Sequence, residues 1–325
     1  MNSPIAIGLG AGLVSAVLLL STATGSPLAM LLFCLVAIPG FIAGLGWGTL
    51  SALVAALSAG AVVTAVTGPV AGAVYLSTLG LPLVLLNYMI LLSRPIATGD
   101  PDGSANLQWY PPGHLIAWAT LFAGAIAALS APLLGWDAET YRNTAREYFE
   151  TTVFNRLPVD GASGLNKEEL EPMIDFLVVL LPATSAIVWL GIMMSNMWAA
   201  GKIVETSGRA IRPWPDIAAL TYPQHFSFGF FVTTLLTFAP GIVGIIATGF
   251  AGAFLLAYII MGLVVLHVVA SGSPFKTFML TVLYMAMVLI GWVSLVVAII
   301  GLGEPVFRLR ERLFKNPKPP DKTGT

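Results

Sequence analysis

The sequence predicts an all-α fold: a polytopic bundle of about eight (eight or nine) membrane-spanning helices, with one amphipathic helix at the membrane surface. Of the 325 residues, 57% are hydrophobic and 10% are charged, and the mean hydropathy is +0.88. A soluble domain carries about 25% charged residues, so this composition excludes a soluble globule. The first charged side chain is Arg94. The uncharged stretch before it has room for about four spans of roughly 20 residues each.

Apolar runs bounded by glycine, proline and charge locate the individual spans. The stretch 226–270 contains Pro240 and Gly241, which predict two helices joined by a tight turn. One segment of the set can instead be a half-span or a re-entrant hairpin, which would leave eight crossings. The predicted spans are 4–20, 27–45, 47–67, 71–93, 114–135, 173–199, the two helices within 226–270, and 276–301.

Three polar stretches separate the spans. Residues 94–113 are dense in Pro, Gly, Asp and Asn, which predicts a loop. The 136–172 insertion is the segment with soluble composition. The stretch 201–224 contains three basic residues and a Pro-Trp-Pro sequence at 213–215, which prevents a continuous helix.

The 136–172 insertion opens with a predicted amphipathic helix. Asp137 is its expected N-cap. Four residues recur at helical spacing and share one apolar face, whereas the opposite face is charged. We expect this helix to lie on the membrane surface or to cap the bundle. The apolar face consists of Tyr141, Ala145, Tyr148 and Phe149, and the charged face of Glu139, Arg142, Arg146 and Glu150.

The basic residues predict the domain organisation and the orientation. Residues 1–313 form a single transmembrane bundle, and 314–325 form a basic, disordered tail. Basic loops stay in the cytoplasm, so the C-terminus and the 201–225 loop should both be cytoplasmic. Three predicted segments separate them, whereas a shared side needs an even number of crossings. Either one segment within 226–270 does not cross the membrane, or the loop violates the rule, and we favour eight crossings in total. We expect a multi-pass protein of the bacterial cytoplasmic (inner) membrane.

The sequence favours a non-enzymatic protein without cofactor or metal. It contains no HExxH helix, GxSxG elbow, Walker loop, CxxC pair or paired intramembrane carboxylates. The single cysteine, Cys34, lies in an apolar run and is expected to serve helix packing. With 15 Lys plus Arg against 16 Asp plus Glu, nothing indicates nucleic acid as a partner.

A few polar side chains near or within the spans are candidates for binding. A polar group at membrane depth is costly and marks a functional site by default. For most of them an ordinary structural role competes: Asp175 and Glu304 as solvated helix ends, His267 as a hydrogen bonder between helices. The residues proposed to line a small-molecule pocket are Asn87, Tyr88, Asp175, Asn196 and His267.

Small-residue spacing predicts close helix packing in the second and third spans. Gly40, Gly44 and Gly48 form a tandem GxxxG pattern, and Gly8 and Gly12 form a second one. Such faces let helix backbones approach closely in lipid. Pro39, just before the first pattern, indicates a short or broken helix.

Four stretches together resemble a known family. They are IPGFIAGLGWGTLSALVAALSAG, LGLPLVLLNYMILLSR, NMWAAGKIVETSGRAIRPWPD and LIGWVSLVVAIIGLGEPVFRLRERL. They are similar to the YybS-like family of uncharacterised bacterial multi-pass membrane proteins, in its alphaproteobacterial form, over residues 5–313. The Pro39 to Gly60 pattern is also distantly similar to the opening helices of the S components of energy-coupling-factor transporters. That resemblance implies binding of a small organic molecule.

Three hypotheses for the function follow. The first is a transporter-like membrane protein with a small-molecule pocket, as in S components. The second is a non-catalytic assembly or scaffold factor that binds a protein partner through the amphipathic helix and the basic tail. The third, an enzyme acting on lipid, rests on four interfacial residues. Homo-oligomers are compatible with all three, and the lipid bilayer is the expected surrounding. Those four residues are His114, Asp175, His225 and Glu304.

Overall fold

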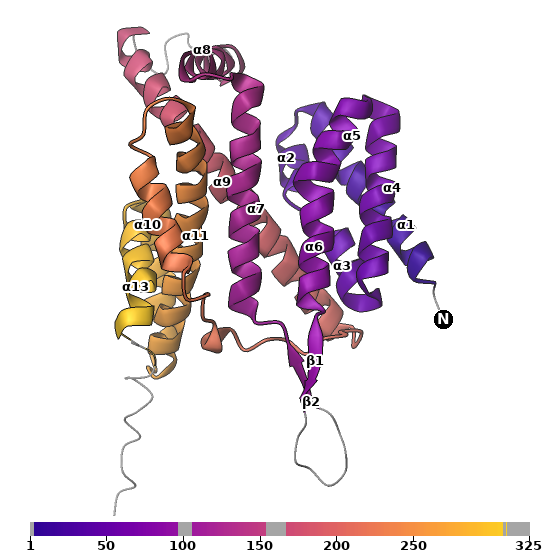
Figure 1. The fold of residues 1–325 in the computed structure, drawn as a ribbon. Helices are drawn as coiled ribbons and strands as arrows, with labels where there is room; N and C mark the ends of the chain where they lie inside the picture. The colour runs from indigo at the N-terminus through magenta and orange to yellow at the C-terminus, as the bar shows by residue number, and fades with distance from the viewer. Residues whose placement is uncertain (1–2, 97–105, 154–166, 308–309, 311–325) are drawn as a thin grey trace, which may run out of the picture.

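The structure is a bundle of helices (Figure 1). The computed structural model describes residues 3–96, 106–153, 167–307 and residue 310. Seven of its helical segments are long and apolar enough to cross a membrane, and three shorter apolar helices accompany them. The predicted all-α transmembrane bundle is thus confirmed. The predicted tail at 314–325 and the region 154–166 lie outside the described residues.

The elements follow one another along the chain with short connections. Two π-helical turns, Leu76–Gly80 and Phe149–Val153, extend neighbouring helices. The helices are α1 (Pro4–Leu20), α2 (Pro27–Phe33), α3 (Ile38–Trp47), α4 (Thr49–Thr67), α5 (Pro69–Tyr75), α6 (Leu81–Ile90), α7 (Pro112–Leu134), α8 (Ala138–Tyr148), α9 (Lys167–Thr206), α10 (Phe226–Leu236), α11 (Ile242–Ser271), α12 (Lys276–Leu289) and α13 (Val293–Phe307). The strands β1 (Ser93–Ile96) and β2 (Asn106–Trp109) pair antiparallel, so the predicted 94–113 loop is in part a β-ribbon.

The first six helices pack together on one side of the bundle, and α9 passes behind α7 and reaches them near α3 (Figure 1). The glycine pair on α1 lies directly against α4, where a β-carbon at Gly8 would meet Ser51 and Val54 and one at Gly12 would meet Ser58. This contact gives α1 and α4 the close approach that small residues permit in lipid.

Two spans of this half are discontinuous, and each break lies just before a proline. The second span is broken at residues 34–37, between α2 and α3, just before Pro39. The fourth span changes to a π-helical turn between α5 and α6, just before Pro82. In the fourth span Pro82 lacks the N–H that would donate to Thr78, and in the second span the N–H of Ile38 donates to Leu35 instead of Cys34, so one carbonyl oxygen in each span loses its helical donor.

The amphipathic helix α8 caps one end of the bundle, as predicted (Figure 1). Asp137 is its N-cap and accepts hydrogen bonds from the backbone N–H groups of Glu139 and Thr140. Tyr141 and Ala145 are buried against residues of α7 and α9. Burial raises the pKa of Tyr141 to about 12. The apolar face of α8 is therefore largely used within its own bundle.

The end of the chain differs from the prediction. The expected single span over 276–301 is wrong, because the helix ends at Leu289 and a new helix begins at Val293. A Gly291 turn joins α12 and α13, and α13 packs on α11 through Gly262 and Gly301. The last hydrophobic segment is therefore a hairpin that returns to the end of the bundle where it began. The predicted turn within 226–270 is present, between α10 and α11.

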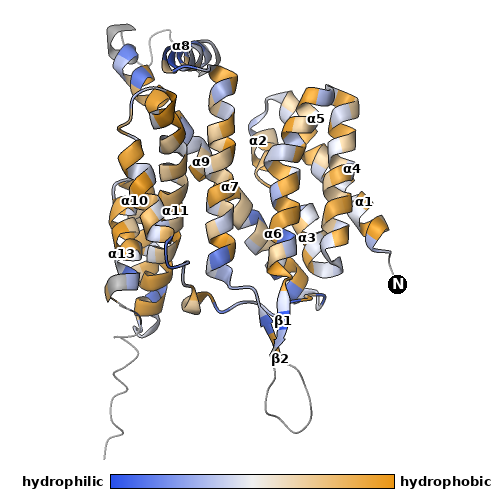
Figure 2. Ribbon diagram, viewed as in Figure 1, coloured by the Kyte–Doolittle hydropathy of each residue, from blue (hydrophilic) through white to orange (hydrophobic). Residues whose placement is uncertain are grey.

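The conflict between the two basic segments is resolved by this hairpin, and not, as the sequence suggested, by a non-crossing segment within 226–270 or by a violation of the basic-loop rule. Arg310, beyond α13, donates a hydrogen bond to the carbonyl of Ala218 in the 207–222 segment. Arg212 of that segment donates to carbonyl oxygens at the end of α6 and before α7. The end of the bundle that carries these contacts and the β-ribbon is called the loop end, opposite the α8 end. Figure 2 shows hydrophilic residues concentrated at both ends and apolar ones between them.

Candidate functional site

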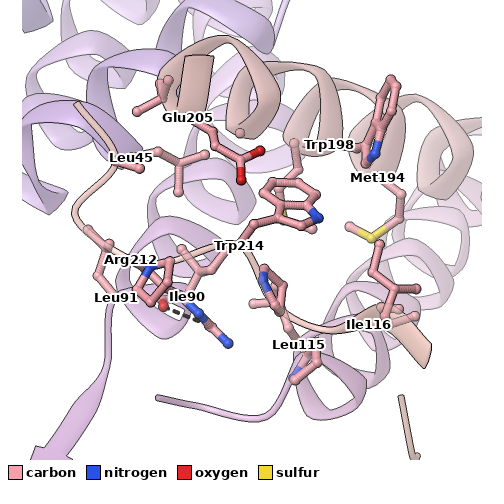
Figure 3. Close-up of a pocket in the computed structure, with 18 of the residues that line it drawn as sticks. Leu45, Ile90, Leu91, Leu115, Ile116, Met194, Trp198, Glu205, Arg212 and Trp214 are labelled. Carbon is pink, nitrogen blue, oxygen red and sulfur yellow. Dashed lines mark hydrogen bonds between the residues drawn. The ribbon is translucent and has the colours of Figure 1, made fainter. Parts of the chain in front are cut away.

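A cavity of about 210 Å³ lies at the loop end, between α7, α9 and the 207–222 segment (Figure 3). Its walls come from the end of α6, the start of α7, the end of α9 and one residue of α11. Apart from Glu205 and Arg212, every lining side chain is uncharged, and most are aliphatic or aromatic. The apolar wall includes Leu45, Ile90, Leu115, Ile116, Met194, Met197, Trp198, Val204, Leu220 and Ile260.

The 207–222 segment covers the cavity as a mostly irregular chain with one short 3-10 turn at Ile217–Ala219. Pro213 and Pro215 flank Trp214, and both prolines line the cavity with it. Arg212 holds this cover in place: its Nη1 donates to the carbonyl of Ile90 at 2.9 Å and its Nη2 to that of Tyr110 at 3.0 Å. One guanidinium thus joins the cover to α6 and to the segment before α7.

Trp214 seats against a glycine of α9. A β-carbon at Gly201 would collide with the indole ring, so a glycine is required for this contact. The ammonium of Lys202 lies 4.6 Å from the centre of the same ring and also pairs with Glu205 at 2.7 Å. A cation above an indole face is attracted by the ring quadrupole. These contacts fix Trp214 over the end of α9.

The charge of Arg212 is only partly compensated. Both of its hydrogen-bond partners are neutral carbonyls, and within the described residues no carboxylate pairs with it. Burial lowers the pKa of its guanidinium, because a partly desolvated cation is less stable than a hydrated one. The Trp109 ring lies 5.8 Å away. The cavity is therefore an apolar space with one cation at its rim.

The asparagines predicted to line a pocket are buried elsewhere. Asn87 is fully buried on α6, where its Nδ2 donates to Leu83 and its amide group abuts Gly44. Asn196 on α9 donates from Nδ2 to the carbonyl of Cys34 at 2.7 Å. Neither residue lines the loop-end cavity. Asn196 supplies the donor that the broken second span lacks at residue 34.

The other three predicted pocket residues also lie apart from the cavity. Tyr88 is 52% exposed on the outer face of α6. Asp175 is exposed near the α8 end and pairs with Arg146 at 2.9 Å. His267 lies on α11, where Nδ1 is 2.8 Å from the carbonyl oxygen of Leu263 and Nε2 is 3.4 Å from the hydroxyl of Tyr284. The structure does not bring the five residues together into one pocket.

The tandem glycines have two different roles. Gly40 and Gly44 face α6, where β-carbons would meet Leu83 and Asn87 respectively. Gly48 instead forms the turn between α3 and α4 with a φ of 94°. This left-handed conformation favours glycine, and a β-carbon there would meet no neighbour.

The remaining polar candidates are also dispersed. His114 packs edge-on against Tyr110 at the start of α7, and His225 is exposed before α10. Glu304 is 6% exposed and accepts a hydrogen bond from Nε of Arg310 at 2.7 Å. Within the described ranges, no three His, Cys, Asp or Glu residues form a group that could hold a metal ion.

Sequence patterns alone did not identify the residues of the cavity. Arg212, Trp214 and Gly201 all lie in the 201–224 stretch, for which the sequence predicts only a polar connection without a continuous helix. A signal was present, since two prolines enclosing a tryptophan next to an arginine predict a rigid, non-helical cover. The sequence does not reveal which residue each of these side chains contacts, because the contacts join segments far apart in the chain.

The architecture is that of a multi-pass, α-helical integral membrane protein with a covered cavity at one end. The family model described as "Predicted membrane protein (DUF2232)" matches residues 13–303. The chain therefore belongs to this family of predicted membrane proteins. No curated protein and no solved structure matches it.

Proposed function

We propose that this protein binds a small, mainly apolar organic molecule in the loop-end cavity and acts as a transporter-like membrane protein. The observation that supports this proposal most directly is the cavity, which is covered by the 207–222 segment and not by a membrane-spanning helix. The Arg212 side chain holds this cover in place. Ligand sites are typically concave, mostly apolar and furnished with a few polar groups. The resemblance to S components supports the same function.

Mass spectrometry of the protein, gently extracted from its own membrane, tests this proposal. We expect a stoichiometric small molecule to copurify with the native chain. Met197→Trp fills the cavity and should abolish copurification. Val188→Trp adds the same indole on the same helix at a 56% exposed position outside the cavity, and should retain the ligand. Equal retention in both variants would contradict the proposal.

We further propose that the protein has no enzymatic activity. Chemistry on a bound molecule needs an acid, base or nucleophile at the reacting atoms. In the cavity, Glu205 and Arg212 are the ionisable side chains, and each is engaged by other groups of the protein. The four residues on which the hypothesis of a lipid-modifying enzyme rests lie on different elements, so the structure gives it little support. They are His114, Asp175, His225 and Glu304.

We also infer that the protein resides in the bacterial inner membrane with the loop end in the cytoplasm. Arg94, Lys202, Arg209, Arg212 and Lys276 all lie at or beside the loop end. The α8 end carries Arg142, Arg146 and Lys167, the first residue of α9, among the described residues. The basic excess therefore favours a cytoplasmic loop end and C-terminus.

An assembly or scaffold factor that binds a protein partner is the second candidate function, and α12 is the observation that favours it. None of its residues is buried, and the turn at 290–292 is exposed. The helix extends about 21 Å from Lys276, so this turn lies at membrane depth. Irregular backbone there is tolerated where protein covers it, which favours a protein neighbour over lipid.

Cross-linking in native membranes tests this alternative. Val282→Cys, at a 49% exposed position of α12 in a Cys34→Ser background, should form an adduct of defined mass with its neighbour. A doubled mass would identify a homo-oligomer instead of a different protein. Leu129→Cys, 71% exposed on α7, is the matched control. Equal cross-linking at both positions, or none at Val282→Cys, would remove the reason for this function.

A further inference from the structure

We propose that the molecule held in the loop-end cavity is an anionic amphiphile, whose apolar chain lies against the aliphatic wall and whose carboxylate or phosphate head binds Arg212. This inference rests on the proposed function, because it assigns a chemical class to the ligand of the same cavity. It adds a polar recognition element to a site described so far as apolar.

The charge balance at the rim favours an anion. Two ionisable side chains line the cavity, Arg212 and Glu205, and Lys202 pairs with the second of them. Glu205 and Lys202 neutralise each other at 2.7 Å, which leaves the guanidinium as the charge of this site that no described carboxylate compensates. A partly buried charge is costly unless it is paired and hydrogen-bonded. An anionic head supplies the missing countercharge.

The geometry of the Arg212 guanidinium also favours an anionic ligand. A guanidinium carries five N–H donors in a rigid planar fork. In this protein one donor from Nη1 and one from Nη2 reach the carbonyls of Ile90 and Tyr110, which fix the plane of the group. Other N–H donors are left for a ligand. Planar, oriented guanidinium groups bind carboxylates and phosphates in two-point contacts.

The position of the cavity fits an amphiphile rather than a free anion. The cation belongs to the polar cover at the loop end, whereas Ile116, Met194 and Trp198 belong to the spanning helices α7 and α9. Figure 3 shows Met194 and Trp198 extending from the α9 helix and Arg212 from the cover. A molecule that contacts both needs a charged end and an apolar body, oriented as lipids are in the adjoining leaflet.

Binding measurements in phosphatidylcholine nanodiscs test the assignment. The probes are oleate, dodecyl phosphate, the uncharged oleyl alcohol, and inorganic phosphate without a chain. We expect the two anionic amphiphiles to bind about tenfold more tightly than the alcohol, as one charge-assisted contact provides, and inorganic phosphate not to bind. Arg212→Gln should remove the tenfold preference, and Arg212→Lys should keep part of it.

Two controls make the outcomes distinct. Arg209→Gln removes a cation that lies over the Trp47 ring, outside the cavity, and should leave the preference unchanged. Continued binding of oleyl alcohol shows that Arg212→Gln is folded. Equal affinity for oleyl alcohol and oleate in the native protein would contradict the proposal that the ligand is anionic. Binding of inorganic phosphate would contradict the proposal that the ligand needs an apolar chain. Absence of binding by every chain-bearing probe would instead refute the proposed cavity function.

Discussion

The indole Nε1 of Trp189 lies 2.8 Å from the carbonyl oxygen of Thr78, four residues before Pro82. In an α-helix the N–H of residue 82 would donate to this oxygen, but proline has none. A side chain of α9 thus replaces a backbone donor missing from the fourth span. Asn196, seven residues further along α9, donates to the carbonyl of Cys34 at the break of the second span, where the N–H of Ile38 donates to Leu35 instead. One helix, α9, thus supplies a side-chain donor to a backbone carbonyl that lacks its helical donor in each of the two discontinuous spans.

Trp189→Phe should destabilise the bundle by about 1 kcal/mol, because it leaves the Thr78 oxygen without a donor in a medium with little water. Unfolding in mixed micelles with increasing sodium dodecyl sulfate measures the change. Trp136→Phe, at an 83% exposed position, is the matched control and should be neutral. In a Pro82→Ala background the N–H returns, so Trp189→Phe should cost much less. An equal cost in both backgrounds would contradict the hydrogen-bond explanation.

Gly44→Leu should destabilise the protein by about 2 kcal/mol, since its side chain would overlap Asn87 and Ala52 in a packed interface. Gly10→Leu is the control, because a β-carbon there meets no neighbour on the exposed face of α1. The same denaturation experiment compares the two. If Gly10→Leu were equally harmful, helix propensity or insertion rather than packing would explain both effects.

The helical class, most span positions and the capping role of α8 were predictable, because apolar length and 3.6-residue periodicity are local properties of the chain. The hairpin of α12 and α13 was not, because Gly291 in an apolar run is equally compatible with a continuous span. The candidate site was missed for another reason. Their polarity made Asn87 and Asn196 candidates for a pocket, but their amides donate hydrogen bonds to backbone carbonyls within the spans. The cavity depends instead on the hydrogen bonds from Arg212 to the carbonyls of residues 90 and 110, which are distant in the sequence.

The α12 and α13 hairpin predicts which positions a membrane-impermeant maleimide can reach. In a Cys34→Ser background, Ser207→Cys and Ser271→Cys should react from the same side, and Thr24→Cys from the opposite side. Gly291→Cys should react from neither, because it lies at membrane depth. Labelling of intact cells and inverted vesicles also tests the proposed cytoplasmic loop end. Opposite sidedness of Ser207→Cys and Ser271→Cys would refute the arrangement of α10 and α11.

Protection of α8 should depend on pH through Asp137. Hydrogen bonds from the backbone and side chain of Thr140 hold the pKa of this carboxyl below its ordinary value. Such a group stabilises the folded state fully above its unfolded pKa, about 3.9, and the stabilisation disappears as the pH falls through the lower folded pKa. Hydrogen-exchange protection of α8, corrected for the intrinsic rate, should therefore fall in that acidic range.

Asp137→Ala should remove this pH dependence and lower the protection of the first turn of α8 at neutral pH. Glu150→Ala changes a carboxylate just beyond α8 that is no N-cap, and should leave the first turn protected. If the native protein and Asp137→Ala lost protection over the same pH range, another group would be responsible.

The contacts of α9 also impose an order on biosynthesis. Trp189 follows Thr78 by 111 residues and Asn196 follows Cys34 by 162 residues. While the ribosome is still making the later part of the chain, the second and fourth spans enter the bilayer with carbonyl oxygens that have no partner. The amino-terminal helices therefore remain an unfinished intermediate until α9 is inserted. Nascent chains that stop before residue 189 should be recognised as incomplete by membrane proteases, and those that extend beyond residue 196 should be spared.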